Sequence, residues 1–213
     1  MSETDQEALV QAVMAAGVQD ARVLQALRET PRAAFVPAHL AEQAYLDEAL
    51  PIPHGQVTTQ PSLVAMMIES LGLTGSETVL EVGAGYGFQT ALLARLARFV
   101  WSIERWPDLV DTARANLASQ GITNVAVVVG DGSEGLPEHA PFEAILVSAA
   151  FPEVPPPLTE QLAPGGRLVQ PIGPGGEDVV MLFERGPQGL APRGVVTGAR
   201  FVRLYGKHGF PAE

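Results

Sequence analysis

Residues 77–87 read ETVLEVGAGYG, an apolar run that leads into an acid and then into a glycine-rich turn. A helical pattern follows over 88–96, so the stretch predicts a strand, a tight turn and a helix in succession. Glycine permits positive φ and close approach of a ligand, and the free N–H groups of the following helix face the same space. A Gly-x-Gly-x-Gly turn of this kind is typical of nucleotide-binding α/β domains, but some strand-to-helix turns contain one by chance. Both interpretations stay open on this stretch alone.

Short apolar segments alternate with helical patterns along the rest of the chain, which predicts buried parallel strands joined by helices. The expected strands are 77–82, 99–104, 125–129, 142–148 and 166–171, and the expected helices are 88–97, 107–120 and 156–163. Two further strands, 178–185 and 195–204, are expected to form an antiparallel pair joined by the turn at 186–189 and the residues after it. The fold class is therefore α/β, a Rossmann-like, doubly wound and mostly parallel sheet of seven strands.

The first sixty or so residues do not show this alternation. Three helices are expected here. The first covers 4–16, the second begins after an N-cap at Asp20, and the third covers 62–71 with Thr59 or Ser62 as its N-cap. The segment 50–61 contains three prolines and a glycine, so it predicts a loop or short strands. We expect one domain over 1–213, in which residues 1–61 form an N-terminal cap on a core of residues 62–213.

Composition limits the classes of function. The 213 residues are 46% hydrophobic and 17% charged, which suits a soluble globular domain. The net charge of −11 argues against binding to nucleic acid or to an anionic membrane. Without cysteine, and with four scattered histidines, the sequence predicts neither a disulfide framework nor a metal site, and it is compatible with the cytoplasm. It contains no Gly-x-Ser-x-Gly elbow, no phosphate-cradling NTPase loop, no secretory signal and no membrane span.

Two acids follow strands of the predicted sheet, at the edge where ligands bind in such folds. Glu104 lies 17 residues after Gly87, suitably placed to accept hydrogen bonds from both ribose hydroxyls of a cofactor; the alternative is a solvated acid that caps a helix. Asp131 lies between two glycines, which suggests a close ligand contact such as one to an adenine amino group. The alternative for Asp131 is an ordinary turn. An acid after the second strand also fits NAD-dependent dehydrogenases, so these residues do not name the cofactor.

Motifs over nearly the whole chain resemble those of protein-L-isoaspartate (D-aspartate) O-methyltransferases, which are S-adenosyl-L-methionine-dependent enzymes of the Rossmann-like class I type. The matches over 55–61 and 102–105 are specific, whereas the glycine turn is shared with all related methyltransferases. The matching segments are FVP (35–37), Ala44-Tyr45 with Asp47, LPI (50–52), Gly55-Gln56 through Gln60-Pro61, VLEVG (79–83) with Gly85, Gln89-Thr90, SIER (102–105), Asn124-Val125, GDG (130–132), Pro141-Phe142, Ala149-Ala150, GGRLV (165–169) and RFV (200–202) with Leu204.

The resemblance implies a site for S-adenosyl-L-methionine, with S-adenosyl-L-homocysteine as the product. The family pattern Gly-Gln-Thr-Ile-Ser-Gln-Pro places Thr59 at the position of its active-site serine, within an active-site loop. Thr59 is therefore the implied catalytic residue, and it contacts the acceptor together with backbone N–H groups near Ala149 and Ala150. The implied cofactor-binding residues are Thr58, Gln60, Glu81, Gly83, Ala84, Gly85, Glu104, Arg105, Asp131 and Gly132.

The chain departs from the family pattern at several positions. Val57 and Thr58 replace threonine and isoleucine before Thr59. In the turn, Tyr86 puts a large ring where serine is usual, and Arg203 replaces a proline. Threonine keeps a hydroxyl but adds a methyl group and restricts χ1, so hydrogen bonding could survive while the shape of the pocket changes.

The reaction that the resemblance implies needs no general base, because a carboxylate with a pKa near ~4 is already ionised at neutral pH. Three hypotheses follow: methylation of isoaspartyl residues in damaged peptides, methylation of another peptide or small-molecule carboxylate, and nucleotide binding without methyl transfer. The expected partner is an isoaspartyl protein or peptide, with no nucleic acid and no membrane. A cytoplasmic monomer is expected.

Overall fold

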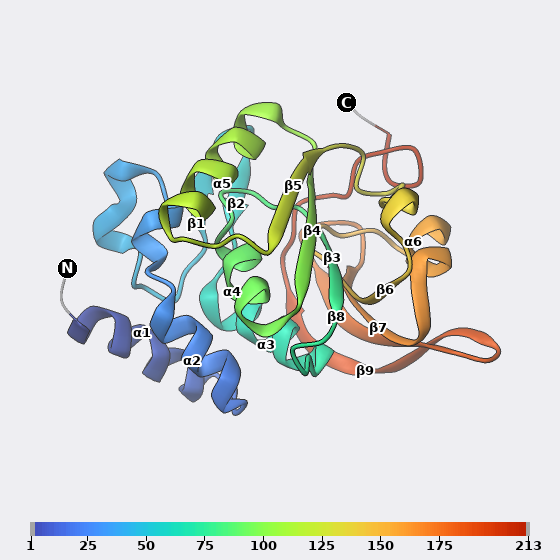
Figure 1. Ribbon diagram of the computed structural model, residues 1–213, viewed down its shortest axis with the longest axis horizontal. Helices are drawn as coiled ribbons and strands as arrows, with labels where there is room; N and C mark the ends of the chain where they lie inside the picture. Colours follow the sequence, from blue (N-terminus) through green and yellow to red (C-terminus); the bar gives the residue numbers. More distant parts are fainter. Residues whose placement is uncertain (1–2, 212–213) are drawn as a thin grey trace.

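The computed structural model describes residues 3–211, and at its centre lies a seven-stranded sheet in the order β5-β4-β3-β6-β7-β8-β9 (Figure 1). Strands β5, β4, β3, β6 and β7 pair in parallel, whereas β8 runs antiparallel to both β7 and β9. This confirms the predicted fold class. The strands are β3 (Thr78–Val82), β4 (Phe99–Glu104), β5 (Val125–Val129), β6 (Phe142–Val147), β7 (Leu162–Ile172), β8 (Asp178–Gly186) and β9 (Gly189–Ala199).

The central strand β3 marks the point where the strand order reverses. Its Leu80 lies opposite Trp101 of β4 on one side and Ile145 of β6 on the other. The chain runs outward from β3 to β4 and β5, and then returns to β6 beside β3. The carboxyl ends of β3, β4 and β6 therefore meet at a topological switch point, where doubly wound sheets bind their ligands.

Neighbouring residues of a strand point to opposite faces of the sheet, so each face has its own core. Val79 packs in a cluster with apolar residues of α1 to α5, whereas Leu80 packs in a second cluster with Leu158 of α6. Figure 1 shows α1 to α5 on one side of the sheet and α6 on the other. The helices are α1 (Glu3–Ala15), α2 (Ala21–Glu29), α3 (Pro61–Leu71), α4 (Phe88–Leu96), α5 (Pro107–Ser119) and α6 (Pro156–Gln161), with short 3₁₀ helices η1 (Arg32–Phe35), η2 (Ala38–Gln43) and η3 (Pro137–His139).

The N-terminal segment packs on the sheet through the first of these cores. Leu9 of α1 and Leu27 of α2 are fully buried in the same cluster as Leu92 of α4. The proline-rich stretch that follows forms a small antiparallel hairpin of β1 (Leu50–Ile52) and β2 (Gln56–Thr58). The hairpin and the chain after it cross the carboxyl ends of the central strands.

Strand β9 begins six residues earlier and ends five residues earlier than the predicted strand 195–204. The turn at 186–189 is tight, and pairing starts at once from Gly189. Pro192 lies in the first half of β9, and β9 is an edge strand, where proline is tolerated. Residues 200–204 leave the sheet because the chain pairs with Ala150 instead: Ala150 N–H donates to Val202 O, and Leu204 N–H donates to Ala150 O, both at 2.8 Å.

The N-cap predicted for α3 is also wrong. Gln60 occupies the N-cap position, and no side chain of the cap itself bonds to the helix. The carboxylate of Asp47 takes that role from another segment, because its Oδ1 accepts a hydrogen bond from Ser62 N–H at 2.8 Å. The side chains of Thr59 and Ser62 therefore do not cap α3, and the hydroxyl of Thr59 is available for other contacts.

Within residues 3–211, no helix combines the length and the apolar character needed to cross a bilayer. The same residues contain no group of three or more potential ligands that could hold a metal ion.

Candidate active site

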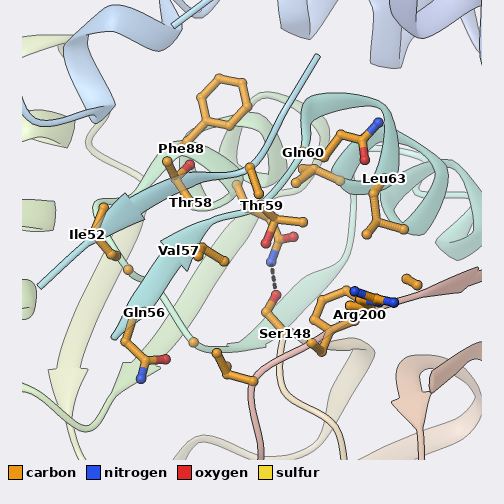
Figure 2. Close-up of a pocket in the computed structure, with 18 of the residues that line it drawn as sticks. Ile52, Gln56, Val57, Thr58, Thr59, Gln60, Leu63, Phe88, Ser148 and Arg200 are labelled. Carbon is orange, nitrogen blue, oxygen red and sulfur yellow. Dashed lines mark hydrogen bonds between the residues drawn. The ribbon is translucent and has the colours of Figure 1, made fainter. Parts of the chain in front are cut away.

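A cavity of about 500 Å³ lies at the switch point of the sheet (Figure 2). Its floor comes from the glycine turn after β3 and from the ends of β4 and β6. The hairpin β1–β2 and the start of α3 form one wall, and the segment at the end of β9 forms another. The predicted residues that line it are Thr58, Thr59, Gln60, Gly83, Ala84, Gly85 and Glu104. The lining residues that sequence reasoning assigned no role include Ile52, Leu63, Gln89, Ser148 and Arg200.

The turn after β3 has the backbone that its glycines predict. Gly83, Gly85 and Gly87 have φ values of 97°, 53° and 91°, a region that side chains strongly disfavour. Gly83 N–H donates to Ile103 O at 2.8 Å, which ties the turn to β4. A Cβ atom on Gly85 would meet Ile52 Cδ1 of the hairpin at 3.4 Å. The turn thus brings bare backbone to the cavity directly beneath the hairpin.

Glu104 joins the turn to the next strand. Its Oε2 accepts from Gly85 N–H at 3.0 Å and its Oε1 accepts from Trp106 N–H at 3.2 Å. The side chain lines the cavity although the residue is only 6% exposed. Burial raises the pKa of Glu104, while the backbone hydrogen bonds favour its ionised form. A carboxylate has about four lone-pair sites, more than these backbone hydrogen bonds occupy, so Glu104 can still accept from a ligand in the cavity.

Glu81 is fully buried and does not line the cavity. Its carboxylate accepts hydrogen bonds from Thr90 Oγ1 and Ser102 Oγ, both at 2.5 Å, and from Gln89 Nε2 at 2.9 Å. Burial raises the pKa of Glu81 despite these donors. Gln89 Nε2 also donates to Ser148 Oγ at 2.8 Å, the bond drawn as a dashed line in Figure 2. Glu81 thereby fixes the side chain of Gln89, which does line the cavity.

The loop that carries Thr59 is held by two polar side chains. The buried guanidinium of Arg32 donates to the carbonyl oxygens of Thr58 at 3.5 Å and Thr59 at 3.2 Å. It also donates to Ala44 O, Leu46 O and Glu48 O. Burial lowers the pKa of Arg32 to about 10, so it stays charged at neutral pH.

Asp47 holds the other side of this loop. Its Oδ2 accepts from Gln60 Nε2 at 3.0 Å, and its Oδ1 accepts from Ser62 N–H. From the sequence alone Asp47, like Glu42 and Glu48, is expected to be solvated, but its carboxylate accepts these two hydrogen bonds. Neither this role nor that of Arg32 has a local signal, because their partners lie 12 to 27 residues away along the chain.

The tip of the hairpin rests on α5. His54 has a positive φ of 61°, and its ring stacks on Trp106 with the ring centroids 4.0 Å apart. Its Nε2 lies 2.9 Å from the carboxylate of Asp108. The hydrogen bond to His54 holds the pKa of Asp108 below its usual range. These contacts fix the hairpin next to the end of β4.

Three predicted cofactor residues lie beside the cavity without lining it. Asp131 accepts from Lys207 N–H at 2.7 Å and from Ser133 N–H at 2.9 Å. Burial raises the pKa of Asp131, but these hydrogen bonds outweigh the burial and hold the pKa below its usual value. The guanidinium of Arg105 lies over the Trp106 ring, 5.0 Å from its centroid. Gly132 packs against β3, where a Cβ would lie 2.3 Å from Val82 Cγ1.

The two predicted acceptor residues after β6 are also behind the wall. Ala150 is fully buried, and its N–H is already bonded to Val202 O. Ala149 is 9% exposed, and neither residue lines the cavity. Ser148, one residue earlier, does line it.

The departures from the family pattern separate in space. Thr59 and Tyr86 line the cavity, so both can change its shape. Arg203 does not line it: its Nε donates to Pro174 O at 3.0 Å, and its guanidinium lies 5.1 Å from the centre of the Phe210 ring. The replacement of proline by Arg203 therefore concerns the C-terminal segment and not the cavity wall.

Comparisons with known proteins agree with this geometry. The family model "Protein-L-isoaspartate(D-aspartate) O-methyltransferase (PCMT)" matches residues 4–209. A protein-L-isoaspartate O-methyltransferase of Anaeromyxobacter dehalogenans (strain 2CP-C) is 53% identical over 190 residues, 88% of this chain and 91% of the relative. One from Methanoculleus marisnigri is 48% identical over 202 residues, 94% of this chain and 91% of the relative. A solved structure of a protein-L-isoaspartate O-methyltransferase superposes with a TM-score of 0.83 at 30% identity, and covers 96% of this chain and 67% of that chain.

The family match includes every residue that lines the cavity, and the relatives are matched over most of their own length. The chain belongs to the protein-L-isoaspartate (D-aspartate) O-methyltransferase family.

Proposed function

We propose that this chain transfers a methyl group from S-adenosyl-L-methionine to the carboxylate of L-isoaspartyl and D-aspartyl residues in damaged proteins or peptides, as the first step of their repair. The observation that carries the proposal is the family match over residues 4–209, which contains the whole cavity. The family is one of methyltransferases, and S-adenosyl-L-homocysteine is the product on the cofactor side.

The residues at the switch point fit the cofactor. The volume of about 500 Å³ lies within the range of roughly 300–1,000 Å³ that is usual for small-molecule sites. Glu104 presents acceptors for the two ribose hydroxyls, and Gly83, Ala84 and Gly85 offer close approach to bare backbone. Thr58 and Gln60 face the same space from the opposite wall. For Glu81, Arg105, Asp131 and Gly132, direct contact with the cofactor stays a prediction.

When bound, the cofactor supplies an electrophilic methyl group on a sulfonium that leaves as a neutral thioether. The protein therefore has to align and desolvate the acceptor, and it needs no general base. Thr59 would donate a hydrogen bond from its hydroxyl to one oxygen of the acceptor carboxylate, which leaves the other oxygen free to react. Its position on the cavity wall and the absence of a capping role support this assignment. Ala149 and Ala150 stay predicted acceptor contacts.

The proposal is tested by incubating the protein with labelled S-adenosyl-L-methionine and matched isoaspartyl and aspartyl peptides. We expect label on the isoaspartyl peptide and none on the aspartyl one. If no label reaches the isoaspartyl peptide while S-adenosyl-L-homocysteine still binds, the acceptor is a different one. Stronger binding of NAD than of S-adenosyl-L-homocysteine, measured by calorimetry, would instead favour a nucleotide-binding protein that does not methylate.

A second candidate, methylation of another peptide or small-molecule carboxylate, is favoured by the placement of Thr59 and Tyr86 on the cavity wall. The variant Thr59→Ser separates the two. If the family substrate is the true one, Thr59→Ser keeps activity on the isoaspartyl peptide within about threefold, because the hydroxyl is retained. If such activity appears only in Thr59→Ser, the pocket of the present chain serves another acceptor.

We further propose that the chain acts as a single domain and as a cytoplasmic monomer that binds neither nucleic acid nor membrane. The buried cluster shared by the cap (1–61) and the core (62–213) supports the single domain. The lack of cysteine and the net charge of −11 support the remaining points. Sedimentation of the purified protein tests the monomer.

A further inference from the structure

The cavity has one acidic and one basic lining residue, and they lie in different surroundings. Glu104 is almost completely buried on the floor. Arg200 is exposed and directly follows the last residue of β9 (Figure 2). Every other lining residue is uncharged at neutral pH. Among the described residues that line the cavity, the exposed charge is thus a cation, in a protein whose net charge is −11.

Arg200 has no partner of its own in the described part of the chain, where it forms no hydrogen bond and no ion pair. The buried carboxylate of Asp178 forms other hydrogen bonds. It accepts from the N–H groups of Gly175, Gly176 and Phe201. Glu177 lines the same shallow surface depression as Arg200 but forms no ion pair with it among residues 3–211. Arg193, within β9, is by contrast paired with Glu184 at 2.9 Å.

The backbone at Arg200 is fixed even though its side chain is free. Phe201 N–H donates to Asp178 Oδ2 at 3.0 Å, and Ala150 N–H donates to Val202 O at 2.8 Å. The guanidinium is therefore carried by a positioned segment and not by a loose loop. Recognition of a planar anion requires a fixed backbone and a guanidinium whose N–H donors are free.

We propose that Arg200 binds the carboxylate of the methyl acceptor at the mouth of the cavity and sets the preference of the site for an anionic acceptor. The inference rests on the proposed function, because the acceptor is taken to be a carboxylate. In the transfer, a carboxylate oxygen forms a bond to the methyl carbon, the carbon–sulfur bond breaks, and its electron pair stays on sulfur. The acceptor becomes a neutral ester and loses its attraction to Arg200, so the same residue favours release of the product.

Binding and turnover of Arg200→Gln test the proposal, with Arg200→Lys as the conservative variant and Arg193→Gln, within the preceding strand β9, as a control. Calorimetry in the presence of S-adenosyl-L-homocysteine compares an isoaspartyl peptide with its α-carboxamide analogue. We expect the wild type to prefer the carboxylate about tenfold, the size of one charge-assisted hydrogen bond. Arg200→Gln should lose this preference, Arg200→Lys should keep part of it, and Arg193→Gln should keep all of it.

Kinetics supply a second readout. In Arg200→Gln we expect KM for the isoaspartyl peptide to rise about tenfold with kcat changed less than about twofold, and a weaker dependence of KM on salt. Unchanged binding of S-adenosyl-L-homocysteine checks that the variant is folded. The inference is overturned if Arg200→Gln prefers the carboxylate as the wild type does, or if the wild type has no preference. A wild type that prefers the carboxylate but transfers no methyl label overturns the proposed function and leaves the role of Arg200 standing.

Discussion

Glu104 is a structural link in the protein, and the proposed function makes the same side chain a ligand acceptor. Its two oxygens bind Gly85 N–H and Trp106 N–H, yet the side chain still faces the cavity. The sequence placed this acid correctly, because the carboxyl end of a strand next to a glycine turn is defined by local pattern. The sequence could not show that burial raises the pKa of Glu104, since this burial depends on the packing of β3, β4 and the hairpin.

Replacement of this carboxylate should weaken cofactor binding. We expect Glu104→Gln to bind S-adenosyl-L-homocysteine about tenfold more weakly, because an amide is a poorer acceptor for two hydroxyls and loses one oxygen. The raised pKa of Glu104 also predicts that the affinity of the wild type falls as the pH drops through that pKa and the carboxylate takes up a proton. Calorimetry over a pH series measures both effects. Glu138→Gln, at an exposed position, is the control, and an equal pH dependence in Glu104→Gln would contradict the assignment.

Among the elements, the hairpin β1–β2 and the loop after it depend on side chains from earlier in the chain. Arg32 donates to five backbone carbonyl oxygens, two of them at Thr58 and Thr59. Such carbonyls would be left without donors if the guanidinium were removed, and buried polar groups without partners are costly.

We therefore expect Arg32→Met to lower the free energy of unfolding by about 3 kcal/mol and to reduce methyl transfer, because the segment that carries Thr59 loosens. Urea unfolding measures the first effect and the labelled assay measures the second. Arg28→Met is a matched control at an exposed ion pair with Glu7, for which the expected loss is under about 1 kcal/mol. If the two variants unfold alike, the buried guanidinium does not hold the loop.

The sequence predicts elements best where the pattern is local. Strands β3 to β6 appear close to their predicted bounds because each is a short and mostly apolar segment. The predicted range of β9 was shifted because the first half of the strand contains proline and glycine, which are tolerated there because the strand lies at the edge of the sheet. Arg200, Ser148 and Gln89 were given no role beforehand. Their place on the cavity wall depends on where distant elements meet, which no local pattern records.

At the scale of the whole molecule, the C-terminal segment is fastened back onto the sheet next to the site. Asp131, after β5, accepts from Lys207 N–H, and Lys207 Nζ pairs with Glu134 at 2.8 Å. Because the pKa of folded Asp131 lies below its ordinary value of 3.8, the ionised form stabilises the fold above that value. This contribution is lost as the pH falls through the folded-state pKa.

Asp131→Asn should therefore lower stability at neutral pH by about 1 kcal/mol, a figure reduced for the partial exposure of the site. The difference from the wild type should shrink as the pH falls below the ordinary value of 3.8. Thermal unfolding over a pH series measures this difference. Asp111→Asn, at an exposed position of α5, should show no such trend, and a gap of constant size for Asp131→Asn would contradict the expected linkage.

The residues that line the cavity span almost the full length of the chain, from Ala16 to Val202. The floor comes from the glycine turn and the ends of β4 and β6, whereas one wall precedes these elements in the sequence and the other follows them. During synthesis on the ribosome, a nascent chain that stops before the end of β9 would carry the glycine turn and Glu104 but would lack Arg200 and the wall beside it. The pocket is thus complete only once Arg200 to Val202 have been made, and clipping by a protease just before this segment should open it while much of the central sheet persists.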